Sequence, residues 1–239
     1  MQLEVINPNV AKRFIADYHY AKICPPHILE PLGLVEESLV GVALWGWGVR
    51  PLHTIQKLWP GLLTKDYREL CRLCVLDRMP RNTESWFLSR CIDWLQRNRP
   101  DVKVLTSWAD GMRGKPGYIY QASNWLYAGY IETEFYVTRE NEVVHPRFLI
   151  TRFGHRDRAT TEALGLTKLR GKQFLYVYPL GSHIQKKTLV RTSQILLSRD
   201  YPKLSDCLVW QAGDASRAMR QATNLEGAVR FRNPAPRLF

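Results

Sequence analysis

Apolar and polar positions alternate in blocks along the first 150 residues, and these blocks predict helices and strands in turn. Asn7 and Pro8 form a helix-capping pair, and apolar residues then recur at helical spacing. Short apolar runs between turn residues predict strands. In chain order we expect a helix at 8–20, strands at 28–35 and 38–46, a Gly- and Pro-punctuated insertion at 47–66, a strand at 69–76, a helix at 85–98, a strand at 102–108, a helix at 118–129, and strands at 130–139 and 143–152.

Alternation of this kind predicts an α/β fold with a mixed central sheet flanked by helices. After this block we expect a helix at 155–165, a strand at 172–181 and a short basic helix at 184–197. The chain then divides into a catalytic domain at 1–150, a basic extension at 151–203 packed on it, and a partly disordered tail at 204–239, where periodicity is lost.

The net charge is concentrated in one segment. Residues 1–145 hold 17 basic and 16 acidic side chains, residues 146–203 hold 12 and 3, and residues 204–239 hold 5 and 3, so the middle segment carries +9 of the total +12. A concentrated positive field indicates a polyanionic partner, such as nucleic acid or an anionic membrane surface. The alternative is a face that is merely solvated.

Membrane insertion is not expected, because the longest apolar stretch, Leu39–Val49, is too short for a spanning helix and contains three glycines. Five scattered cysteines suit a reducing cytoplasm. Cys71 and Cys74 have C-x-x-C spacing, but within a strand they face opposite ways and cannot hold one metal ion. We interpret them as core thiols.

Two groups of candidate functional residues come from the first helix and the strand at 69–76. His19 and Tyr20 place an imidazole and a phenol, both competent iron ligands, at the end of the helix. The alternative is an aromatic pair with one ring in the core. Arg72 stands among apolar residues, so its guanidinium needs either a ligand or a structural ion pair, for instance with Glu69 or Asp77.

A third candidate is the loop at 78–85, which leads into a helix. A helix N-terminus offers backbone N–H groups and a positive dipole to phosphate, and Arg81 adds charge. Arg81, Asn82 and Ser85 are therefore candidate cofactor-binding residues. The alternative is an ordinary helix start capped by Ser85.

The fourth candidate is Asp110, which follows the strand at 102–108, at the edge where α/β sheets bind ligands. Tyr120, Asn124 and Tyr127 would share one stripe of the helix at 118–129. Such a stripe can bind a metal ion or the edge of a nucleobase. The alternative is that it only packs.

Longer motifs resemble known families. The element order of residues 1–150 resembles the GNAT acetyltransferase fold, and IYQASNWLYAGY is similar to the last helix of that fold. Tyr18-His19-Tyr20, ELCRLCVLDRMPRNTESWFLSRCIDWL, TSWADGMRGKPGYIYQASNWLYAGY and YVYPLGSHIQKKTLVR together resemble the Mom family of phage DNA-modification proteins. The resemblance covers roughly residues 10–203.

The Mom resemblance implies an enzyme that converts adenine in phage DNA to a carbamoylmethyl-substituted adenine and so protects the DNA from host restriction enzymes. It also implies iron and a small-molecule donor of the added group. Acetyl-coenzyme A stays an open alternative, because the loop at 78–85 replaces the glycine-rich loop of acetyltransferases. Carried over by motif, the implied catalytic residues are Arg72, Ser85, Asp110 and Tyr120, the implied iron ligands are His19, Tyr20, Asp110 and Tyr120, and Asn124 joins the cofactor-binding candidates.

An enzyme that acts on the amino group of adenine must flip the base out of double-stranded DNA, and it needs a surface that grips phosphates. The basic segment supplies the candidate DNA-binding residues Arg147, Arg152, Arg156, Arg158, Lys172, Lys186, Lys187 and Arg191. Two other functions stay open: a conventional acetyl-CoA-dependent N-acetyltransferase and a non-catalytic DNA-binding phage protein.

Overall fold

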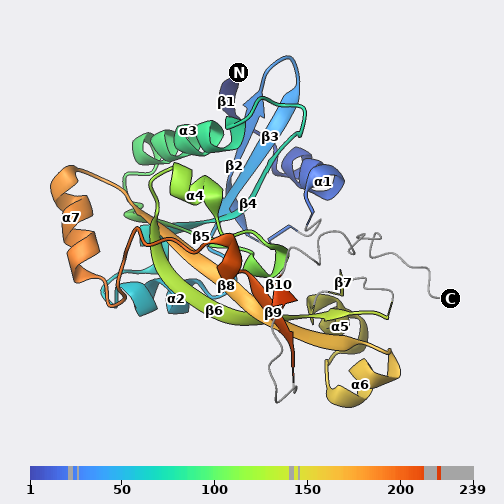
Figure 1. Cartoon of the computed structure of the whole chain (residues 1–239). Helices are drawn as coiled ribbons and strands as arrows, with labels where there is room; N and C mark the ends of the chain where they lie inside the picture. The colour runs from blue at the N-terminus through green and yellow to red at the C-terminus, as the bar shows by residue number, and fades with distance from the viewer. Residues whose placement is uncertain (21–23, 26, 140–142, 145, 213–219, 222–239) are drawn as a thin grey trace. The chain divides into compact units, whose positions relative to one another are not determined.

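The computed structural model describes residues 1–239 except 21–23, 26, 140–142, 145, 213–219 and 222–239 (Figure 1). The chain folds into two compact units that interleave along the sequence. Unit 1 comprises Met1–Trp108, Tyr118–Gly129 and Leu175–Tyr201, and unit 2 comprises Ala109–Gly117, Tyr130–Phe174 and Pro202–Phe239. The predicted boundaries after residues 150 and 203 remain predictions, and the limits of the two units fall elsewhere.

Unit 1 is built on a mixed sheet whose strands follow the order β1-β2-β3-β4-β5-β8-β6. Neighbours from β1 to β4 are antiparallel, whereas β4 and β5 are parallel. The predicted mixed α/β sheet flanked by helices is therefore confirmed. Its strands are β1 (Gln2–Val5), β2 (Ile28–Val35), β3 (Leu39–Gly46), β4 (Tyr67–Val75), β5 (Val104–Ala109), and the parts of β6 (Leu126–Val137) and β8 (Thr167–Pro179) that belong to this unit.

Two helices of unit 1 cover opposite sides of the β2–β4 strands (Figure 1). Helix α1 (Pro8–Tyr18) starts where the Asn7 side chain accepts the Asn9 N–H at 2.8 Å, as its capping pair predicts. Its buried residues pack on Val42 and Leu44 of β3. Helix α3 (Thr83–Asn98) buries an apolar stripe at helical spacing: Phe87, Leu88, Cys91, Ile92 and Leu95.

The rest of unit 1 includes α2 (Pro51–Leu58), the short α4 (Tyr118–Ala122) and α7 (His183–Thr192). α2 lies in the predicted insertion, and α7 confirms the predicted basic helix. Ile55, Leu58 and Trp59 form a buried cluster with Tyr67 and with strand residues of β5 and β8. The N-terminal strand β1, which pairs with β2, was not expected from the sequence.

A buried ion-pair triad ties three elements of unit 1 together. Glu30 of β2 is only 2% exposed and bonds Arg68 of β4 at 3.0 Å and Arg99, at the end of α3, at 2.7 Å. Burying a charged side chain without a partner costs free energy. The Glu30 carboxylate reduces this cost for the buried Arg68, and the two arginines reduce it for Glu30.

Unit 2 contains the remaining parts of β6 and β8, with β7 (Val143–Val144) paired to β6 and β9 (Leu208–Gln211) paired to β8. It also contains α5 (Pro146–Phe153) and α6 (Arg158–Ala163), of which α6 confirms the predicted helix at 155–165. The short strand β10 (Arg220–Gln221) pairs with β9. Of the predicted tail, residues 204–212 and 220–221 are described, and the remainder lies outside the described residues.

Three predictions about helices and strands are wrong. The helix at 118–129 ends at Ala122, because Asn124 takes a left-handed conformation (φ 60°) and the aromatic run after it enters β6. The strand expected at 143–152 is instead α5, with Pro146 at its first position, where proline favours a helix start. The cap of α3 is Asn82 rather than Ser85.

None of the described helices is long and apolar enough to cross a membrane.

Candidate functional site

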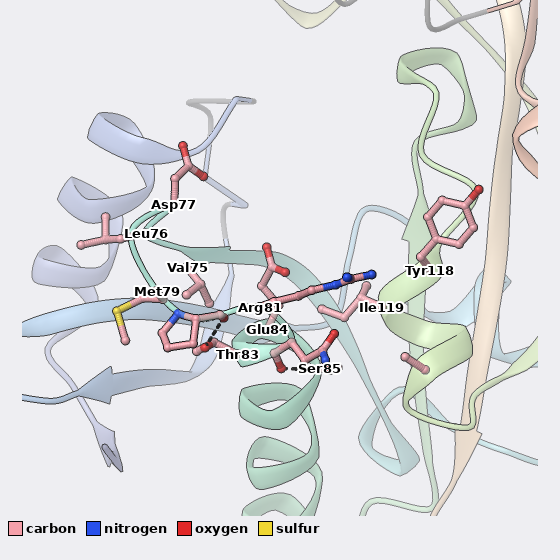
Figure 2. A pocket seen from close by; sticks show the side chains of 13 residues that line it. Val75, Leu76, Asp77, Met79, Arg81, Thr83, Glu84, Ser85, Tyr118 and Ile119 are labelled. Carbon is pink, nitrogen blue, oxygen red and sulfur yellow. Dashed lines mark hydrogen bonds between the residues drawn. The ribbon is translucent and has the colours of Figure 1, made fainter.

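A pocket of about 400 Å³ lies in unit 1 where the end of β4, the loop after it, the start of α3 and the helix α4 meet (Figure 2). Such a volume suits a small molecule or part of a larger cofactor. Three predicted cofactor-binding residues, Arg81, Asn82 and Ser85, line this one pocket. The other lining residues are Val75, Leu76, Asp77, Met79, Pro80, Thr83, Glu84, Tyr118, Ile119 and Ala122.

The first turn of α3 forms one wall of the pocket. Asn82 is left-handed (φ 70°) and makes no side-chain cap, while Ser85 Oγ donates to the Asn82 carbonyl at 3.0 Å. Figure 2 shows the exposed Arg81 side chain extending toward the α4 side of the pocket. The turn therefore presents a guanidinium and a helix N-terminus to a ligand, although Asp77 and Glu84 on the same rim restrict where an anion can sit.

Strands β4 and β5 separate next to this pocket. Their parallel pairing is described from Tyr67–Val104 to Leu70–Ser107, while β4 continues to Val75. Ser107 Oγ donates to the Leu70 carbonyl at 2.9 Å and lies 2.8 Å from the hydroxyl of Tyr120, on α4. The opening thus lies at the carboxyl ends of two parallel strands, the edge at which α/β sheets bind ligands.

A β-bulge at Cys71 changes the direction of the side chains of β4 close to where β4 and β5 separate. The register with β3 pairs Leu70 with Trp45 and Arg72 with Leu44, so Cys71 lies between them as an extra residue. Arg72 is half-buried, and its guanidinium donates to the Cys71 carbonyl at 2.6 Å. Cys71 is also half-buried, and burial raises the pKa of its thiol to about 12, so it is a poor nucleophile.

The carboxyl of Glu69, on β4, has a pKa far from its ordinary value. Burial raises the pKa of its carboxyl to about 7, while a hydrogen bond with the Trp108 side chain and the charge of Arg72 partly oppose the shift. Gly48 (φ 70°) packs its backbone so closely that a Cβ there would collide with this carboxyl. A carboxyl with a pKa near neutrality can both accept and release a proton at physiological pH.

We expect Glu69 to make the folded state less stable as pH rises. Its folded-state pKa of about 7 exceeds the ordinary 4.5, so the folded protein holds the proton more tightly. The stabilisation is complete below about pH 4.5 and is lost by about pH 7. Its upper bound is about 3 kcal/mol at 1.36 kcal/mol per pKa unit.

Melting temperatures of the wild type and Glu69→Gln across this pH range test the expectation. The variant, which keeps the shape but cannot ionise, should be more stable than the wild type at pH 8, and its stability should vary less with pH. Parallel pH profiles for the two proteins would contradict the raised pKa.

Tyr120 is buried among aromatic rings rather than on a polar helix stripe. Its ring lies 5.3 Å from Trp125 and 5.0 Å from Tyr176, measured between centroids. Burial raises the pKa of its phenol to about 12, against the lowering effect of the bond to Ser107. The expected stripe does not exist, because Asn124 and Tyr127 lie beyond the end of α4, and Asn124 is exposed and does not line the pocket.

The structure does not test the four implied iron ligands as a set, because Asp110 belongs to a different unit from the other three, and the set stays a prediction. The Tyr120 hydroxyl lies 2.8 Å from Ser107 Oγ. His19 is buried, and its ring stacks on the ring of Tyr20 with 4.3 Å between the ring centroids. Asp110 belongs to unit 2, where it pairs with Arg113 at 3.6 Å. Among the described residues no three His, Cys, Asp or Glu side chains gather as a metal site.

The candidate DNA-binding residues differ in their unit and in whether an acid of the chain offsets their charge. In unit 2, Arg156 bonds Glu134 at 2.7 Å and Arg158 bonds Glu162 at 2.6 Å, so acids of the chain itself offset their charge. Arg152 is exposed, and Lys172 lies over the ring of Tyr130. The side chain of Arg147 lies outside the described part of the structure. Lys186, Lys187 and Arg191 all lie on α7 in unit 1.

Sequence reasoning missed Glu69 and Ser107 as site residues. Glu69 entered only as a partner for Arg72, although an acid within an otherwise apolar strand is itself a signal. Ser107 had no such signal, because its role depends on where β4 and β5 separate.

Comparisons with known proteins place the chain among relatives. The model of the Mom protein family matches residues 1–203. The methylcarbamoylase Mom of Escherichia phage Mu is 29% identical over 209 residues, which cover 85% of this chain and 84% of that protein.

Similar solved structures include two acetyltransferases. They are a ribosomal-protein-alanine N-acetyltransferase from Brucella melitensis (TM-score 0.43, 12% identity, 75% of this chain and 100% of that one) and an aminoglycoside 6'-N-acetyltransferase from Enterococcus faecium (TM-score 0.42, 10% identity, 77% and 99%). At these TM-scores the similarity says nothing about activity.

Proposed function

The chain belongs to the Mom protein family, and from this premise we propose that it is a transferase that modifies DNA. In the specific form of the proposal, it converts adenine in phage DNA to N6-carbamoylmethyladenine and so protects that DNA from host restriction. The observation that carries the proposal is the family match over residues 1–203, together with the similarity to the methylcarbamoylase of phage Mu across most of both chains.

The pocket beside α3 supports the donor side of this proposal. We assign it to the small molecule that supplies the added group, or to a phosphate-bearing carrier of it. Acetyl-coenzyme A belongs to the alternative N-acetyltransferase function, because its thioester transfers an acetyl group and does not form an N–CH₂ bond. Arg81 and the first turn of α3 would hold a phosphate, and the apolar wall of Val75, Ile119 and Ala122 would hold the rest.

The chemical side of the proposal is supported by Glu69, Arg72, Ser107 and Tyr120, which we call the polar cluster. When the N6 amine of adenine attacks the CH₂ carbon of the donor, the bond from that carbon to the donor's leaving group breaks, the leaving group departs with the electron pair, and the amine loses a proton. Glu69, with its pKa of about 7, is suited to accept it, and Arg72 lies within electrostatic range of that carboxyl. Asp110, Tyr120 and Ser85 stay predicted catalytic residues, and no step of this proposal is assigned to iron.

Mass spectrometry of nucleosides tests the function. The chain is produced in a bacterium, total DNA is digested, and we expect a deoxyadenosine that carries a carbamoylmethyl group in place of one hydrogen. The same measurement on Glu69→Gln and Asp110→Ala should show a strong loss of the modified base, with equal amounts of folded protein as the control. Unmodified DNA together with an acetylated amine or protein would favour an N-acetyltransferase, and DNA binding without any product would favour a non-catalytic protein.

A further inference from the structure

Helices α2 and α7 pack together on one part of unit 1. The Trp59 indole, directly after α2, donates to the Leu189 carbonyl of α7 at 2.9 Å, and the Gln194 N–H, after α7, donates to the Leu58 carbonyl at 2.8 Å. Ile55 and Leu58 are fully buried, and Leu189 packs against the same cluster. The two helices are therefore neighbours on a packed base, and we call their exposed residues together the outer face of α2 and α7.

That outer face is basic and free of acidic residues. Its exposed basic residues are Arg50, directly before α2, His53 and Lys57 on α2, and Lys187 and Arg191 on α7. The sequence has no Asp or Glu at any position in 38–65 or in 163–199. Across the described residues, none of these four Arg and Lys side chains takes part in a salt bridge.

Several cations of unit 2 are paired with acids, although unit 2 holds five of the eight predicted DNA-binding residues. Glu134 bonds both Arg156 and Lys168, and Glu162 bonds Arg158. Cations that are already paired release fewer counterions when they meet a phosphate, because part of their charge is compensated within the protein. The cations of α2 and α7 therefore differ from Arg156, Arg158 and Lys168 in having, within the described structure, no acid of the chain paired with them.

We propose that the outer face of α2 and α7 binds the phosphate backbone of duplex DNA. This inference rests on the proposed function in taking DNA as the substrate, and it adds the α2 residues, which lie in a part of the sequence with little net charge overall. Backbone contacts position an enzyme on the duplex without specifying sequence, so this face would act on DNA of any sequence.

Duplex DNA fits this face better than an anionic membrane does. A helix that lies on a membrane exposes a broad apolar side. On α7 the apolar Leu189 packs into the protein, and the exposed apolar side chains of the two helices, Leu52, Ile184 and Val190, are scattered among cations and do not form a broad apolar side. Scattered apolar residues among cations can contact sugars but give little membrane affinity.

Fluorescence anisotropy with a labelled duplex of arbitrary sequence, over a series of salt concentrations, tests the proposal on the full chain. The variant Lys57→Gln/Lys187→Gln/Arg191→Gln should bind roughly tenfold or more weakly, and the slope of log K against log salt should fall by about 0.9 for each phosphate that the variant no longer neutralises. The control Lys12→Gln/Arg13→Gln/Arg97→Gln removes the same charge from exposed positions on α1 and α3 and should bind like the wild type.

Three results would overturn the proposal: equal slopes for the α2–α7 variant and the wild type, an equal loss of affinity in the control, or a larger loss when Arg156, Arg158 and Lys168 are neutralised instead. Binding to anionic vesicles that depends on the same three residues, with DNA binding unaltered, would reassign the face to a membrane.

Nucleoside analysis separates the proposed DNA-binding surface from the proposed function. A chain that modifies DNA but whose α2–α7 variant binds normally refutes this surface alone, whereas a chain that leaves DNA unmodified refutes the function.

Discussion

Ala122→Trp is expected to abolish DNA modification, with a loss of roughly 100-fold or more in the yield of modified base, or about 2.7 kcal/mol in transition-state stabilisation. Ala122 is exposed and lines the pocket between α3 and α4, so an indole there would fill the space assigned to the donor. Because the methyl group it replaces is not part of the core, the fold should survive. The measurement is nucleoside mass spectrometry at matched protein levels.

The matched control is Ala16→Trp, which places the same side chain on the exposed face of α1, away from the pocket lining. It should retain full modification. The affinity of Ala122→Trp for duplex DNA should also be unchanged, because the proposed DNA surface lies on α2 and α7. Normal modification by Ala122→Trp would show that the pocket does not hold the donor.

Glu30→Gln is expected to cause the largest loss of stability, about 3–5 kcal/mol, because removing one member of a buried ion pair leaves an uncompensated charge. Glu30 is 2% exposed and is shared by Arg68 and Arg99. The amide keeps the shape but provides no negative charge, so Arg68, itself buried, would lose its counterion.

Chemical denaturation followed by circular dichroism gives the free energy of unfolding for this comparison. Glu37→Gln removes the same charge at an exposed turn position and should change that energy by less than about 0.5 kcal/mol. The double variant Glu30→Leu/Arg68→Met should be more stable than Glu30→Leu alone, because it removes the stranded charge as well. Equal stabilities for the double and single variants would show that Arg68 does not depend on Glu30.

Most of the first half of the fold was predictable because its signals are local. Asn7 and Pro8 marked the start of α1, and the continuous apolar runs of β2 and β3 marked strands buried on both faces. The wrong predictions came where one residue decides the outcome. The left-handed Asn124 ends α4 where apolar spacing favoured a longer helix, and Pro146 starts a helix in a segment whose β-branched residues favoured a strand.

The candidate site was predictable only in part. The loop before α3 is contiguous in sequence, so Arg81, Asn82 and Ser85 could be grouped from their spacing. The polar cluster joins residues from separate elements through a bulge at Cys71 and a strand separation after Leu70, and neither feature leaves a mark in the sequence. The raised pKa of Glu69 likewise depends on burial, which is a property of the folded chain.

The interleaving of the two units sets a condition on synthesis. Unit 1 needs Leu175–Tyr201, which supplies Leu175 and Val177 to its buried cluster. A ribosome releases the chain from its N-terminus, so unit 1, which holds Glu69 and Tyr120, cannot be completed until about residue 201 has emerged. For the same reason, a fragment that ends at residue 150 would expose the apolar surface these residues cover, and nascent chains stalled before this point would depend on chaperones.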